Sequence, residues 1–158
     1  MVKINFDAAV SEKKMSFGMI ARNPDGFVLG GAIVEINTQA EWTEIKAFKE
    51  SILFAINRNF SDVLFEADNV SLIIVEVDAL LVVRLLQHPY MHTHPFCYLL
   101  HHCWKLIEEG WVTMVRQRHR EGNLCANHLA SLAQDLAADS IVLTEPPPSL
   151  LPLLQANA

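Results

Sequence analysis

The hydrophobic pattern of the chain changes period near residue 42, and this change limits the folds that are open to it. Residues 2–7 (VKINFD) alternate apolar and polar side chains, which predicts a half-buried strand. Residues 15–22 and 27–36 predict two more strands, joined by an Asn-Pro-Asp-Gly turn. From Trp42 to Asn57 the apolar residues follow helical spacing instead. The chain therefore begins as a three-stranded antiparallel meander and continues with a helix.

The second half of the chain adds elements of both kinds. Strands are predicted over residues 61–68 (SDVLFEAD) and 111–118, and helices over residues 80–86, 96–108 and 124–138. The resulting order predicts an α/β fold in which helices flank a mixed sheet. Residues 1–143 form the predicted domain. Residues 144–158 are rich in proline and predict an irregular or polyproline-like tail.

The overall composition indicates a globular protein. Hydrophobic residues make up 51% of the 158 residues and charged residues 19%, while the net charge is −6. This charge disfavours a strongly cationic, non-specific nucleic-acid binder, but it is compatible with a nuclease whose acidic site holds metal ions. Neither a signal peptide nor a membrane span is expected, and three cysteines without a CxxC pair fit a reducing, intracellular location.

Six stretches carry a resemblance to a known family: VKINFDAAV, FGMIARNPDGFVL, TEIKAFKESILFA, FSDVLFEADN, HREGNLCANHLASLA and the EPPPSLLPLL tail. In their order and spacing they resemble the ribonuclease H-like family. The likeness is to its plant type, the RNase H domain of non-LTR retroelement reverse transcriptases. The resemblance covers nearly the whole chain. It implies a ribonuclease H-like fold, with a five-stranded mixed sheet of order 3-2-1-4-5 and helices on both faces.

The resemblance also implies a catalytic site. In the family, carboxylates bind two Mg²⁺ ions, with Mn²⁺ as an alternative, and the enzyme cleaves the RNA strand of an RNA–DNA hybrid. Carried over to this sequence, the metal ligands are Asp7, Glu44 and Asp68. Oxygen ligands suit Mg²⁺, and two such ions can activate water and stabilise the leaving oxygen.

Two positions depart from the family pattern. The fourth carboxylate of an Ala-Asp-x-Leu-Ala motif is replaced by Asn127, whose neutral amide holds a metal less well. The histidine that usually stands three residues before the Arg-Glu-Gly-Asn run is replaced by Gln117, with His119 two residues away. These departures leave open a second function, a retroelement-derived nucleic-acid-binding domain that has lost catalysis.

The third metal ligand has two candidates. Residues 71–78 (SLIIVEVD) repeat the pattern of residues 61–68 ten residues later, so that Asp78 matches the same motif as Asp68. Counting from Glu44 favours Asp68, whereas counting back from the Arg-Glu-Gly-Asn run favours Asp78. A ten-residue insertion or local duplication explains both counts, and Asp68 is preferred because a clean loop and strand precede it.

Basic residues and a histidine-rich segment complete the set of candidates. Contacts with nucleic-acid phosphates are predicted for Lys46, Lys49, Arg116, Arg118 and Arg120, with a solvated charged face as the alternative. Cys97 and His101 are four residues apart within a His/Cys cluster, which suggests a zinc site, although surface histidines are the preferred interpretation. The expected partner is an RNA–DNA hybrid, and the chain is compatible with a part of a larger reverse-transcriptase polyprotein.

Overall fold

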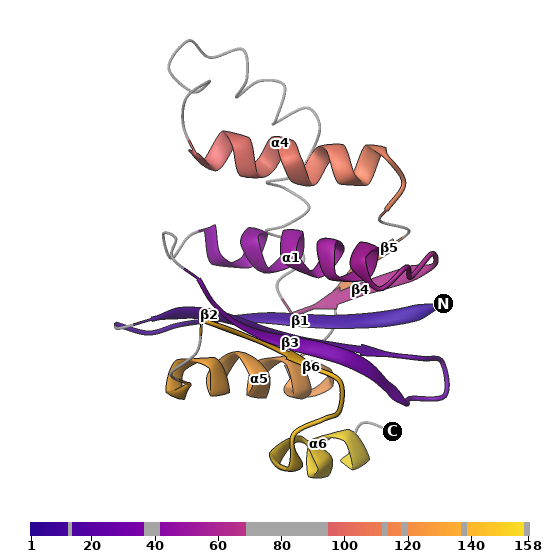
Figure 1. Ribbon diagram of the computed structural model, residues 1–158, viewed down its shortest axis with the longest axis vertical. Coiled ribbons are helices and arrows are strands. Elements are labelled where there is room, and N and C mark those ends of the chain that lie inside the picture. The colour runs from indigo at the N-terminus through magenta and orange to yellow at the C-terminus, as the bar shows by residue number, and fades with distance from the viewer. Residues whose placement is uncertain are drawn as a thin grey trace.

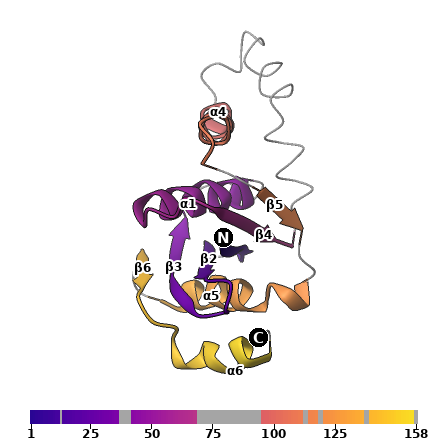
Figure 2. The same ribbon diagram turned by 90° about the vertical axis from the view of Figure 1, so that its right-hand side faces the viewer.

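A twisted sheet runs through the middle of the molecule, and helices cover both of its faces (Figures 1 and 2). The structure is a computed structural model that describes residues 1–12, 14–36, 42–68, 95–111, 114–117, 120–136 and 139–156. The predicted elements at residues 71–78 and 80–86 lie outside the described residues, and so does Asp78. Among the described helices, none has the length and apolar character needed to cross a bilayer.

The described residues form a six-stranded sheet in the order β5-β4-β1-β2-β3-β6. The strands are β1 (Val2–Val10), β2 (Met15–Arg22), β3 (Val28–Ile36), β4 (Val63–Ala67), β5 (Met114–Gln117) and β6 (Ser140–Leu143). β1 pairs in parallel with β4 and β4 with β5, whereas the other neighbours are antiparallel. The predicted order 3-2-1-4-5 is thus present, and β6, which was not predicted, extends it at the β3 edge.

The helices divide between the two faces of the sheet. They are α1 (Thr43–Asn57), α4 (Pro95–Glu108), α5 (Leu124–Asp135) and α6 (Leu151–Ala156), with short 3-10 helices η2 (Arg120–Gly122) and η3 (Pro148–Leu150). α1 lies on one face with α4 packed outside it, while α5 and α6 lie on the other face (Figure 2).

The α1 face is filled by large aromatic side chains. Phe6 on β1, Phe48 on α1 and Phe65 on β4 are fully buried. The Phe48 ring lies 5.7 Å from that of Phe6 and 5.8 Å from that of Phe65, measured between centroids. The predicted apolar stripe of α1 therefore faces the sheet, and its packing fixes the first turn of the helix over β1.

The α5 face is packed through small residues instead. A Cβ added at Gly18 on β2 would come within 2.4 Å of the Ala130 backbone nitrogen and 2.7 Å of the Ala126 carbonyl oxygen. The Ser16 hydroxyl donates a hydrogen bond of 2.8 Å to the Ala130 carbonyl oxygen. α5 consequently approaches the backbone of β2 more closely than any larger side chain would allow.

The prediction of an irregular C-terminal tail is wrong for residues 148–156. Pro148 stands in the first turn of η3, where a missing backbone N–H costs nothing. Leu150 is fully buried in a second core cluster with Ile20 and Leu129. Burial of Leu150, with Leu153 and Leu154 partly buried against the same cluster, favours a defined structure in this proline-rich segment.

Candidate metal and nucleic-acid site

Three carboxylates from distant parts of the sequence meet at one place, and we call Asp7, Glu44 and Asp68 the acidic group. One carboxylate oxygen from each lies within 4.8 Å of the others. Parallel pairing of Asn5 with Glu66 brings β1 and β4 side by side, two residues before Asp7 and Asp68 respectively. Glu44 comes from the first turn of α1, which packs over β1.

The electrostatics of the acidic group favour a cation. Burial is the main reason that the pKa of Glu44 rises from its ordinary value of 4.5 to about 8, and the charges of Asp7 and Asp68 raise it further. Its Oε2 atom is buried and has no hydrogen-bond partner among the described residues. A buried oxygen without a donor, surrounded by like charges, fits a position that a divalent cation would neutralise.

Asn127 lies beside the acidic group at the position that the sequence indicated for the fourth corner. Its Nδ2 donates a hydrogen bond of 2.8 Å to Asp7 Oδ2, and the Ala8 backbone N–H donates one of 3.0 Å to Asp7 Oδ1. Asp7 is only 3% exposed, so these two donors hold its carboxylate in place. The structure thus brings Asp7, Glu44, Asp68 and Asn127 together, and their function as ligands or catalytic groups stays a prediction.

Solved structures share this architecture. RNase H1 from the halophilic archaeon Halobacterium salinarum aligns with a TM-score of 0.61 at 18% identity, covering 85% of this chain and 97% of that one. LC11-RNase H1, solved in complex with an RNA/DNA hybrid, aligns with a TM-score of 0.60 at 17% identity, covering 85% and 97%. The protease-reverse transcriptase of prototype foamy virus aligns with a TM-score of 0.61 at 15% identity, covering 87% of this chain and 21% of that protein.

The chain has the ribonuclease H fold. A family model described as reverse transcriptase-like also matches residues 69–133, which is less than half of the chain. The matched range begins one residue after Asp68 and includes both Asp78 and Asn127. Comparison with curated proteins gave no match.

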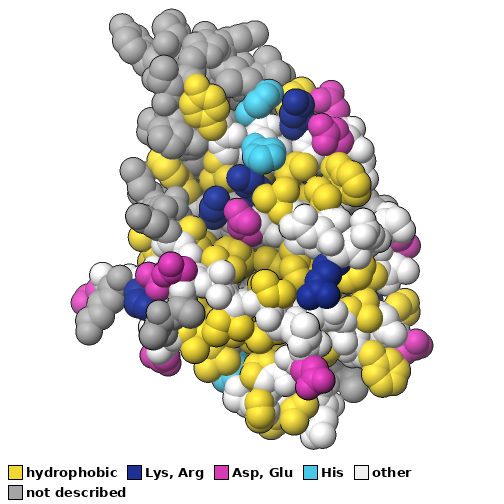
Figure 3. Space-filling model, in the orientation of Figure 1, with side chains coloured by type: hydrophobic (Ala, Val, Ile, Leu, Met, Phe, Trp, Pro, Cys, Tyr) yellow, Lys and Arg dark blue, Asp and Glu magenta, His cyan; other side chains and the backbone are white. Residues whose placement is uncertain are grey.

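The described members of the predicted basic set lie on different elements, Lys46 and Lys49 on α1 and Arg116 on β5. Lys46 pairs with Glu50 one turn along α1 at 3.1 Å. Lys49 lies close enough to α4 that its charge helps to lower the pKa of His102, behind the larger effect of burial. On the face drawn in Figure 3, Lys and Arg side chains lie among apolar, acidic and uncharged ones. Arg118, and the side chain of Arg120, lie outside the described part of the chain, as do His119 and the side chain of Gln117.

A row of three polar side chains lies next to the acidic group, and the sequence pointed only to its arginine. Asn5, Glu66 and Arg116 are neighbours in register across β1, β4 and β5, and we call them the polar row. Asn5 and Glu66 are each 1% exposed. Polar residues at buried positions of apolar strands were the available signal, but only the register of the sheet places the three side by side.

Asn123 and Arg22 connect the polar row to the rest of the fold. Arg22 Nη2 donates a hydrogen bond of 2.8 Å to Asn5 Oδ1. Asn123 precedes α5, and instead of capping the helix its side chain donates a hydrogen bond of 3.0 Å to the Phe6 carbonyl oxygen. The asparagine of the Arg-Glu-Gly-Asn run therefore ties the start of α5 to the central strand, close to Asp7.

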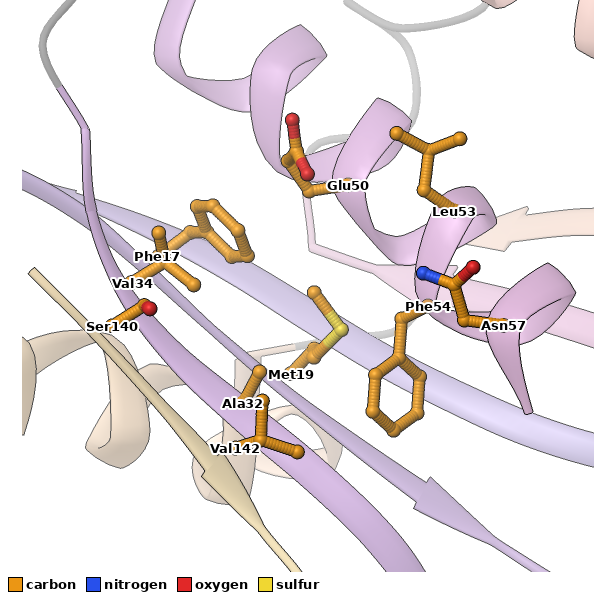
Figure 4. Close-up of a pocket in the computed structure, with 10 residues that line it drawn as sticks. All are labelled: Phe17, Met19, Ala32, Val34, Glu50, Leu53, Phe54, Asn57, Ser140 and Val142. Atoms are coloured by element: carbon orange, nitrogen blue, oxygen red, sulfur yellow. The ribbon is translucent and has the colours of Figure 1, made fainter.

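The described part of the histidine-rich segment supplies no ligand to this site, and the side chain of Cys97 lies outside the described residues. Among the described residues, only the acidic group has three metal-ligating side chains close enough to share an ion. Burial raises the pKa of the Cys103 thiol to about 12, which keeps it protonated. Between α1 and the β3–β6 edge lies a largely apolar groove that includes Phe54 and Val142 and none of the acidic group (Figure 4).

Proposed function

We propose that this chain is an RNase H-type domain that binds RNA–DNA hybrids and hydrolyses their RNA strand with divalent metal ions. The observation that carries the proposal is the meeting of Asp7, Glu44 and Asp68 on three different elements of a ribonuclease H fold. Carboxylates that three separate elements bring together repel one another, and a bound cation would compensate that repulsion.

The chain's own residues have distinct parts in this proposal. Asp7, Glu44 and Asp68 would hold Mg²⁺ or Mn²⁺, which supplies activation of a water molecule and stabilisation of the leaving oxygen. The Ala8 N–H and the Asn127 amide orient the Asp7 carboxylate. Glu44 is the group whose protonation competes most directly with a bound cation, because its pKa lies near 8.

Within the RNase H-like family, we propose more narrowly that the chain is a plant-type domain of a retroelement reverse transcriptase. The support for this is the Arg120–Asn123 run, followed by the Ala126–Ala130 motif on α5, together with the partial match to a reverse transcriptase-like model. In the foamy virus neighbour, the matching region is about a fifth of a longer protease-reverse transcriptase. We propose the same arrangement, part of a larger polyprotein, for this chain.

A second function is supported by one specific observation at the fourth corner. Asn127 offers an amide where the family has a carboxylate, and its N–H₂ group already donates to Asp7. The partial positive charge on the N–H hydrogens of the Asn127 amide weakens the binding of a cation at this point. The alternative is therefore a hybrid-binding domain whose catalysis is impaired.

Cleavage of an RNA–DNA hybrid in Mg²⁺ and in Mn²⁺ separates the two functions. The parent chain is compared with Asp7→Asn, which removes a carboxylate of the acidic group, and with Asn127→Asp, which restores the family residue. Activity in the parent that disappears in Asp7→Asn supports an active nuclease. Activity only in Asn127→Asp supports an impaired domain, and inactivity of all three argues against the catalytic proposal.

The choice of third ligand needs its own pair of variants. Asp68 belongs to the acidic group, so Asp68→Asn is expected to abolish cleavage and to weaken the binding of Mg²⁺. Asp78→Asn is the matched control, since Asp78 fits the same sequence motif. The reverse result would assign the third position to Asp78.

A further inference from the structure

The polar row holds an arginine in a fixed position at the edge of the site. Both the Nε and the Nη2 of Arg116 donate hydrogen bonds to Glu66 Oε1, the first at 3.1 Å. The other carboxylate oxygen, Oε2, accepts a hydrogen bond of 3.1 Å from Asn5 Nδ2. A buried carboxylate is tolerated only when its oxygens are paired in this way, so Glu66 and Arg116 fix each other.

One side of the Arg116 guanidinium is left facing outward. Glu66 is 1% exposed, whereas the Arg116 side chain is 49% exposed. Its Nη1 atom donates no hydrogen bond to any residue that the structure describes. Arginine carries five N–H donors in a planar fork, so one edge can pair with a carboxylate while another binds a phosphate. Arg116 therefore presents a pre-oriented donor edge.

The polar row, and with it the donor edge of Arg116, lies next to the acidic group. Asn5 and Asp7 are two residues apart on β1, whereas Asp68 comes two residues after Glu66 and directly follows the last residue of β4. Side chains two residues apart point to the same face of a strand and lie about 7 Å apart along it. The polar row and Asp7 thus share one face of the sheet, one step apart, and a carboxylate oxygen of Asp68 lies within 4.8 Å of one of Asp7.

The other described basic residues of the predicted set lie elsewhere. Lys46 is paired with Glu50, and Lys49 faces α4, across the sheet from α5. Arg116 is consequently the described member of that set that stands next to the acidic group with a free donor edge. Arg116 is ion-paired as well, but its guanidinium has N–H donors beyond those that contact Glu66, and these can meet a phosphate beside the acidic group.

We propose that Arg116 binds a backbone phosphate of the nucleic acid beside the acidic group, and that Glu66 is its positioning residue. This inference rests on the proposed function, since it names the contact by which the hybrid is placed at that site. Arg116 supplies the charge and the planar fork. Glu66, anchored through Asn5, supplies the orientation.

The test is binding of a fluorescein-labelled RNA–DNA hybrid to the full chain, followed by anisotropy over a series of salt concentrations with Ca²⁺ as the divalent ion. Arg116→Ala should weaken binding about tenfold, because a charge-assisted hydrogen bond is lost. It should also reduce the slope of log K against log salt by about 0.9, the value of one phosphate contact. Arg58→Ala is the matched control, since it removes the same charge at the end of α1 away from Glu44, where Arg58 lies over the Phe54 ring, and it should change neither quantity.

Glu66→Gln and Arg116→Lys test the positioning role. Both keep the charge at position 116, so both should leave the salt slope unchanged while weakening binding by roughly threefold. Glu66→Gln should have no further effect in the Arg116→Ala background, because it acts only through the arginine. Circular dichroism checks that each variant is folded, and Arg116→Lys decides the question if Glu66→Gln is not.

Each outcome bears on a different claim. An Arg116→Ala chain that binds like the parent, or no worse than Arg58→Ala, overturns the inference while the proposed function stands. Equal weakening by Glu66→Gln with and without Arg116 overturns the positioning role of Glu66. A parent chain that does not bind the hybrid at any salt concentration overturns both this inference and the proposed function.

Discussion

α1 and α5 each bring one side chain to the acidic group, from opposite faces of the sheet, and the two contributions differ in charge. α1 supplies Glu44, whose Oε2 is buried without a donor among the described residues and whose pKa rises to about 8. α5 supplies Asn127, a neutral amide that donates to Asp7 at 2.8 Å. One helix therefore adds electrostatic repulsion to the site, and the other helix removes some of it.

The two helices are also positioned by different means. α1 is placed by the volume of Phe6, Phe48 and Phe65, whereas α5 is placed by the absence of a side chain at Gly18. Removing one of these aromatic side chains leaves a cavity between α1 and the sheet. Adding a single carbon atom at Gly18 instead forces α5 away from β2. The comparison predicts different responses to substitution on the two faces.

The largest effect is expected on the α1 face. Phe48→Ala should lower the free energy of unfolding by about 3–5 kcal/mol, because it removes a fully buried ring from between two others. Urea denaturation measures the change. Phe27→Ala is the matched control, since Phe27 is 70% exposed and its loss should cost less than about 0.5 kcal/mol. Similar losses from both substitutions would show that aromatic volume does not hold this face together.

The charge of Glu44 should produce the next largest effect, and it depends on pH. When a chelator keeps the site free of metal ions, the unfolded chain releases the Glu44 proton near pH 4.5. The folded chain releases it only near pH 8. The folded state therefore binds more protons between these values, and the free energy of unfolding falls as pH rises through this window. Glu44→Gln should remove this contribution and exceed the parent in stability at pH 9 by roughly 3 kcal/mol.

Urea denaturation from pH 5 to pH 9 in the presence of EDTA measures that difference. Glu50→Gln, on the same helix but paired with Lys46 near the surface, is the control and should follow the parent curve. A Glu44→Gln curve parallel to the parent at every pH would mean that the carboxyl is not held under repulsion.

The sequence predicted the scaffold better than the details of the site. The change of period at Trp42 and the Asn-Pro-Asp-Gly turn located four elements, because local periodicity and turn chemistry are properties of contiguous residues. The motif resemblance selected Asp7, Glu44 and Asp68 as candidates, and the structure brings them together. Their role as metal ligands stays a prediction.

The features that were missed depend on long-range pairing. β6 is only four residues long, too short for a period to be recognised, and it forms because β3 offers an edge. The hydrogen bonds of Glu66 to Asn5 and Arg116 follow from sheet register, which no local pattern contains. The choice between Asp68 and Asp78 was ambiguous because two neighbouring segments carry the same motif.

A smaller effect is expected from the close approach on the α5 face. Gly18→Ala should lower the free energy of unfolding by roughly 1–3 kcal/mol, because the new Cβ meets the backbone of α5 and pushes the helix outward. The shift should also loosen the contact between Asn127 and Asp7. Asn127→Ala should therefore cost less in the Gly18→Ala background than in the parent, as a double-mutant cycle in urea would measure. An equal cost in both backgrounds would contradict the coupling.

The smallest effect is expected from substitution of Asn127 itself. In EDTA, Asn127→Asp should lower the free energy of unfolding by about 1–2 kcal/mol, because a hydrogen bond to a carboxylate is replaced by repulsion. Mg²⁺ or Mn²⁺ should raise the melting temperature of this variant more than that of the parent, since the added carboxylate strengthens cation binding. The control is Asn57→Asp at an exposed position on α1, which should gain nothing from the metal.

The pairing of β6 with β3 has a consequence for synthesis of the chain on the ribosome. Residues 31–34 must wait for residues 140–143 before their outer edge is covered. During that interval the nascent chain presents an unpaired strand edge, which is a template for association with other chains. β6 thus covers the exposed edge of β3 after the other described strands have been synthesised. A chaperone would protect this protein most in the period just before β6 emerges from the ribosome.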